Sequence, residues 1–148
     1  MRRLGWLVAV WLWAAPAVAE DLIMVRAPLA FSDAMNVIQQ SVRDHGYKVA
    51  RVQRVDVGLK SRGFETAEYR LVYIARGDEI ERITERHPEL LPYLPLKIVM
   101  IAEGDSTIAL TMNPDMLGPL FPGVDLHLQI RRWDNDLRSI LEQYAGTP

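Results

Sequence analysis

One stretch, residues 96–112, restricts the fold of this chain more than any other. It holds two apolar runs rich in β-branched residues, LKIVMIA and TIALTM, separated by Glu103, Gly104, Asp105 and Ser106. Glycine supplies the positive φ that a tight turn between two strands needs, so the pattern predicts a β-hairpin. The first arm is apolar on both faces. We therefore expect the hairpin at the centre of a sheet that is covered on both sides or contacts a second subunit.

The N-terminus has the pattern of a secretory signal peptide. Arg2 and Arg3 precede the apolar run 4–15, and the small residues Ala17 and Ala19 suit a signal peptidase. The run is too short for an ordinary membrane-spanning helix. We therefore expect residues 1–19 to be removed and residues 20–148 to form one periplasmic or secreted domain without stable membrane insertion. An uncleaved anchor is the alternative.

The composition excludes several classes of function. The chain has no cysteine, which rules out thiol catalysis, disulfide exchange and covalent haem attachment through Cys-x-x-Cys-His. Its formal net charge is −2, and the signal peptide holds two arginines and no acidic residue, so the exported domain is more acidic than the whole chain. An acidic domain is a poor ligand for nucleic acid, and we expect no such partner.

Hydrophobic periodicity predicts the remaining elements. We expect a strand over 22–27, a helix with Ser32 as its N-cap that ends at His45-Gly46, a bulged edge strand within 47–59, a strand over 69–75 and a short helix over 77–87. A long amphipathic helix follows from about residue 125 to residue 144. Its apolar stripe consists of Leu126, Ile130, Trp133, Leu137, Ile140, Leu141 and Tyr144.

The segment between the hairpin and the last helix, residues 113–123, is unusually apolar for a loop. It carries Met116, Leu117, Leu120 and Phe121. Such a segment must pack on the body of the domain, on a second copy or on a ligand. These four residues are therefore candidates for the interface of a homodimer, together with the sheet face opposite the helices.

Candidate ligands for a cofactor come from methionine and histidine, because cysteine is absent. Met112 ends the hairpin, Met116 follows four residues later, and His87 ends the short helix. Thioether and imidazole groups together suit copper ions or the axial positions of a noncovalent haem. The alternative is that the methionines fill the core and that His87 is a half-buried, hydrogen-bonded residue.

The order of these segments resembles an uncharacterised family, domain of unknown function 302. The matching stretches are 31–57, 69–74, the Leu-Pro-rich 87–96 and the hairpin ending in Met112-Asn113-Pro114. The resemblance implies an α+β fold in β-α-β-β-α-β-β-α order, with helices packed on one face of an antiparallel sheet of about five strands, similar to the TATA-binding-protein-like architecture. It also implies frequent homodimers and no established catalytic activity.

No catalytic motif supports an enzyme. Gly-x-Ser-x-Gly, His-Glu-x-x-His and a Gly-rich phosphate loop are all missing from the sequence, and we name no catalytic residue. The interpretation is an exported, non-catalytic α+β domain that binds a small molecule or metal, or serves as an accessory protein-interaction protein. The alternatives are a periplasmic enzyme of unknown reaction and a purely structural homodimeric interaction module.

Overall fold

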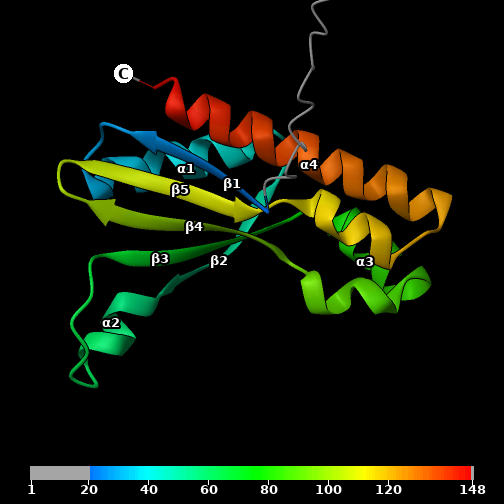
Figure 1. The fold of residues 1–148 in the computed structure, drawn as a ribbon, viewed down its shortest axis with the longest axis horizontal. Coiled ribbons are helices and arrows are strands. Elements are labelled where there is room, and N and C mark those ends of the chain that lie inside the picture. The colour runs from blue at the N-terminus through cyan, green and yellow to red at the C-terminus, as the bar shows by residue number, and fades with distance from the viewer. Residues whose placement is uncertain (1–20, 148) are drawn as a thin grey trace, which may run out of the picture.

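The computed structural model describes residues 21–147, which form a five-stranded antiparallel sheet with helices (Figure 1). The predicted signal peptide lies outside these residues. In chain order the elements are β1 (Leu22–Ala27), α1 (Phe31–Asp44), β2 (Lys48–Arg54), α2 (Val55–Lys60), β3 (Tyr69–Ala75), α3 (Gly77–Arg86), the 3-10 helix η1 (Pro88–Tyr93), β4 (Leu96–Glu103), β5 (Ser106–Met112), the 3-10 helix η2 (Pro114–Leu120) and α4 (Val124–Ala145).

The hairpin lies at the centre of the sheet, as predicted. The strand order is β1-β5-β4-β3-β2, so β4 is the middle strand. Strands β4 and β5 pair across a turn in which Gly104 has a φ of +58°, a backbone conformation that favours glycine. The first strand therefore pairs with the last one, with Leu22 opposite Met112.

Helices α1 and α4 pack on each other and on one face of the sheet. In Figure 1, α1 lies behind the strands and α4 runs along the edge at β1. The predicted stripe of α4 is confirmed, because all seven of its residues are buried in the core. On β4 the core-facing side chains are Leu96, Ile98 and Met100. The prediction of an α+β fold with helices on one face of the sheet is confirmed.

The predicted N-cap of α1 is wrong by two residues. The helix begins at Phe31 with Ala30 as its N-cap, and Ser32 is an exposed residue of the first turn. Phe31 is buried, and its ring lies 5.3 Å from the guanidinium carbon of Arg70. Packing of this ring under Arg70 thus sets the first turn in place of a serine cap. The predicted end is confirmed, since Gly46 follows with a φ of +77°.

Residues 47–59 do not form one strand. The edge strand β2 and its irregular register between Val49 and Arg51 agree with the prediction. Residues 55–60, however, form the helix α2, where Asp56 is buried and pairs with Arg70. A buried ion pair with the neighbouring strand takes the chain out of the sheet at this point.

Within residues 21–147, no helix combines the length and the apolar character that crossing a membrane would require.

Candidate functional site

The face of the sheet away from α1 and α4 is apolar, and we call it the open face. Strand β5 shows why, because Thr107, Ala109 and Thr111 point into the core while Ile108, Leu110 and Met112 point outward and are only half-buried. The same alternation continues on the other strands. The apolar residues of the open face are Leu22, Met24, Tyr69, Leu71, Tyr73, Val99, Ile101, Ile108, Leu110 and Met112.

These side chains lie in register across four strands. One row runs through Met24, Leu110, Val99 and Leu71, each opposite the next. In Figure 1 no helix crosses in front of β4 and β5 on this side. An antiparallel sheet with one free face normally places polar residues there. A contiguous, partly exposed apolar surface of this kind is typical of interaction surfaces.

Charged side chains of both signs bound the open face. On β4, Lys97 lies at one end and Glu103 at the other. Glu103 also pairs with Arg26 of β1 at 2.5 Å, and both side chains remain more than half exposed. Among the ion pairs found in residues 21–147, none involves Lys97. Within the described part of the chain, the central strand therefore has an unpaired lysine at one end of the face and, at the other, a glutamate paired with Arg26.

A pocket of about 310 Å³ lies at the Lys97 end of the sheet. Its lining includes Tyr73, Lys97 and Met112 from the open face, and Leu117 and Leu137 from the core side. The hydroxyl of Thr111, another lining residue, donates to the backbone carbonyl of Lys97 at 2.8 Å. The pocket thus joins the open face to the core. Its volume is at the lower limit of small-molecule sites, about 300 to 1,000 Å³.

The three candidate cofactor ligands do not line one cavity. Met112 lines the pocket beside Lys97, whereas His87 lines a separate pocket with Leu120 and Phe121, and Met116 lines neither. His87 Nδ1 lies 3.3 Å from Glu89 Oε1. Within residues 21–147, no group of three or more His, Cys, Asp or Glu is placed to hold a metal ion. Binding of one cofactor by Met112, Met116 and His87 together stays a prediction, and these three residues share no cavity in the described part of the chain.

The four interface candidates of the 113–123 segment divide into two groups. Leu117 is buried in the chain's own core, and Phe121 packs edge-on against Tyr93 with ring centroids 5.8 Å apart. Met116 and Leu120 are exposed. The segment therefore folds mainly onto the body of the domain, and only two of its residues are free for a partner.

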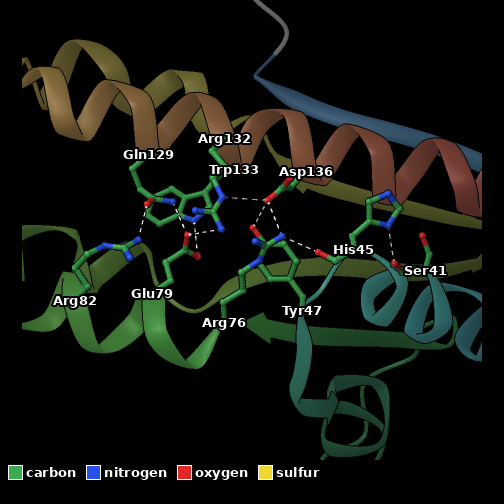
Figure 2. Close-up of polar contacts among 10 residues, drawn as sticks. All are labelled: Ser41, His45, Tyr47, Arg76, Glu79, Arg82, Gln129, Arg132, Trp133 and Asp136. Atoms are coloured by element: carbon green, nitrogen blue, oxygen red, sulfur yellow. Dashed lines mark hydrogen bonds and ion pairs between the residues drawn. The ribbon is translucent and has the colours of Figure 1, made fainter.

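A buried polar network joins α3 to α4 (Figure 2). The carboxylate of Glu79 is 2% exposed and accepts hydrogen bonds from Trp133 Nε1 at 3.0 Å and Gln129 Nε2 at 2.6 Å. Arg132 Nη2 lies 3.8 Å from the same carboxylate. Sequence reasoning missed Glu79, although Trp133 pointed to it: an indole N–H on a buried stripe needs an acceptor.

The network continues around Asp136 of α4. Its Oδ2 accepts from the hydroxyl of Tyr47 at 2.8 Å and from Arg76 Nη2 at 3.3 Å, and Arg76 also donates to the carbonyl of His45 at 2.7 Å. Burial and then the hydrogen bond to Asp136 raise the pKa of Tyr47 above its ordinary value. Figure 2 shows these side chains meeting between the end of α1, the start of α3 and α4. The carboxylates of Glu79 and Asp136 thus connect α3 and the end of α1 to α4.

Comparison with known proteins identifies a family and a crystal structure with a similar fold. The model of the family described as "Domain of unknown function DUF302" matches residues 23–144. The crystal structure of an uncharacterized conserved DUF302 protein from Bacillus stearothermophilus has a similar fold, with a TM-score of 0.77 and 17% identity over 84% of this chain and 98% of that one. No curated protein matches the sequence. Since the family model covers most of its length, the chain belongs to the DUF302 family.

Proposed function

We propose that this chain is an exported, non-catalytic interaction protein that pairs with a second copy of itself through the open face. The observation that carries the proposal is the row of apolar side chains that crosses four strands without cover. Export rests on Arg2, Arg3, the short apolar run and the Ala-x-Ala step. The function is then that of a scaffold or adaptor formed by two copies.

A second copy fits this face better than an unrelated partner does. The central strand β4 places Lys97 and Glu103 at opposite ends of the apolar surface. A surface that carries both signs in this way can complement itself, as a two-fold symmetric interface requires.

The hydrogen-bonded carboxylates of Glu79, which is buried, and Asp136, which is half-buried, support a non-catalytic role. Glu79 accepts from Trp133 and Gln129, and Asp136 accepts from Tyr47 and Arg76. A general acid or base must face the space that a substrate occupies. The carboxylates of Glu79 and Asp136 instead accept hydrogen bonds that connect α3 and the end of α1 to α4, which is a structural role.

The test compares two lysine substitutions at residues of matched exposure. Met24 is 63% exposed on the open face, and Leu128 is 65% exposed on α4. We expect the wild type to be a dimer at 100 μM. Met24→Lys should raise the dissociation constant of the dimer at least about tenfold, because it places a charge in an apolar interface. Leu128→Lys should leave the dimer intact. Light scattering after gel filtration measures this, and a monomeric wild type would refute the proposal.

Small-ligand binding is a second candidate function, and the pocket at Met112 favours it. The volume of about 310 Å³ suits a copper ion with its surroundings or a compact molecule better than a haem macrocycle. Met112 is the candidate cofactor ligand that lines this pocket. Met24, on β1, does not line it and provides a matched control.

We expect Met112→Leu to weaken binding of Cu(I) and Met24→Leu to leave it unchanged, because Met112 lines the pocket and Met24 does not. Titration against a Cu(I) indicator measures both affinities. Equal affinity of the wild type and the triple variant Met112→Leu, Met116→Leu, His87→Ala would end this candidate function.

A further inference from the structure

The open-face side chains of β4 form a self-complementary series. They are, in order along the strand, Lys97, Val99, Ile101 and Glu103. When the strand direction is reversed, the two central positions remain apolar, and the positive and negative ends of the series change places. Two copies of this strand laid face to face in antiparallel directions would therefore set each lysine near a glutamate.

The neighbouring strands share the same midpoint. Met100 lies between Val99 and Ile101 and is in register with Arg70 of β3 and Ala109 of β5, and Val25 of β1 is opposite Ala109. We call this row the midline.

Each of these four strands, β1, β3, β4 and β5, carries one open-face residue directly on either side of the midline. These pairs are Leu71 and Tyr69, Val99 and Ile101, Leu110 and Ile108, and Met24 and Arg26. Apart from Arg26 at the edge strand, both members of every pair are apolar.

We propose that the two copies meet about a two-fold axis that runs across the strands along this midline, which pairs Lys97 of each copy with Glu103 of the other. The inference rests on the proposed function, since it specifies how the open faces meet. Each strand then lies over its own counterpart with reversed direction, and Val99 packs near Ile101 of the second copy. Packed sheets keep their strands within about 30° of alignment, which long lysine and glutamate side chains can span.

The other two-fold axis that stacks these faces runs along the strands, and the charges oppose it. It would set Lys97 near Lys97 and Glu103 near Glu103 of the second copy. Like charges placed across an interface disfavour an arrangement strongly. The apolar residues fit both arrangements, so the charges of β4 decide between them.

This arrangement also brings the second copy to the pocket. The β4–β5 turn, residues 103–106, follows Glu103 and so lies over the Lys97 end of the facing copy. Tyr73, Lys97 and Met112 form the open-face part of the pocket lining at that end. The pocket is thus completed by the turn of the second copy, and any ligand there contacts both subunits.

The experiment is a charge exchange between Lys97 and Glu103, read by sedimentation equilibrium of the full mature chain. Lys97→Glu and Glu103→Lys should each raise the dissociation constant of the dimer at least about tenfold, because each places like charges opposite one another. The double variant should return to within about threefold of the wild type. It also lacks the pair with Arg26, so its recovery reports the contact between residues 97 and 103 alone.

Charge reversals on other surfaces provide the controls. Lys60→Glu on α2 and Glu142→Lys on α4 alter exposed residues away from the open face and should leave the dimer unchanged. As a second measurement, a mixture of Lys97→Cys and Glu103→Cys chains should be cross-linked by a short bismaleimide, while neither chain alone should be.

The possible results separate the two proposals. Single variants that weaken the dimer and a double variant that recovers support the axis. A dimer that is equally stable in all four forms, or that cross-links only between identical residues, overturns the axis and leaves the open-face dimer standing. A wild type that stays monomeric at 100 μM overturns both.

Discussion

Truncation of Trp133 to alanine is expected to lower the free energy of unfolding by about 3–5 kcal/mol, the usual cost of removing a large core aromatic. Trp133 is fully buried on α4, and its Nε1 donates to Glu79 Oε2 at 3.0 Å. Alanine would therefore remove the ring from the core and take one donor from a buried carboxylate. Urea denaturation followed by circular dichroism measures the loss. The protein concentration is held fixed, because the proposed dimer would make the apparent stability depend on concentration.

Trp133→Phe separates packing from hydrogen bonding. It keeps most of the apolar ring but lacks the N–H, so its cost should be about 1–3 kcal/mol, the penalty for a buried acceptor left without its donor. A loss below about 1 kcal/mol for Trp133→Ala would contradict the position of α4 on the core.

Replacement of Asp56 by alanine is the second large expected effect, again about 3–5 kcal/mol, because it removes the close partner of a largely buried charge. Within residues 21–147, the substitution leaves Arg70 only the exposed Glu68, 4.0 Å away, for an ion pair. The side chains of Asp56 and Arg70 are 4% and 11% exposed, and the guanidinium of Arg70 donates to the Asp56 carboxylate. Burial lowers the pKa of Arg70 from its ordinary value, which reflects the cost of keeping this charge away from water.

Asp33→Ala provides the matched control. Asp33 is exposed in the first turn of α1, where a carboxylate interacts only with the helix dipole, so we expect a loss of about 0.3–1 kcal/mol. Thermal and urea unfolding of both variants would measure the difference. Similar losses for Asp33→Ala and Asp56→Ala would show that the ion pair does not anchor α2 to the sheet.

Strong local sequence patterns made the central hairpin and α4 predictable. On β4 the signal is a continuous apolar run, Ile98 to Ile101, followed by a turn with Gly104 and a second apolar run. The stripe of α4 repeats over five turns, and its spacing leaves one face for the core. Both patterns concern neighbours along the chain, which is the information that a single sequence carries best.

Contacts between distant residues account for what the sequence did not predict. The sequence predicts a bulged strand within residues 47–59, but Asp56 pairs with Arg70, fourteen residues later, and residues 55–60 form a helix. Glu79 likewise lies among charged residues of α3, and its burial goes with contacts to Gln129 and Trp133, 50 and 54 residues away. Neither the contact of Asp56 with Arg70 nor that of Glu79 with Trp133 produces a periodic pattern in the sequence.

The candidate site was predictable only in part. The apolar character of both faces of β4 indicated a covering partner, and the structure leaves Val99 and Ile101 half-buried on the open face. The separation of Met112 from His87 could not be read from spacing, since η1 and η2 direct these residues to different pockets.

The pairing of the first strand with the last one imposes an order on folding. Strand β1 begins at Leu22, yet its partner β5 ends at Met112, so the polypeptide must extend through nearly the whole sheet before β1 can close it. At ribosomal rates of about 5–20 residues per second, the N-terminal strand waits roughly 5 to 20 s for its partner. During this interval the β3–β4–β5 meander can form by local pairing, whereas β1 remains an unpaired apolar segment. Closure of the sheet by β1 is therefore a late step of folding during synthesis.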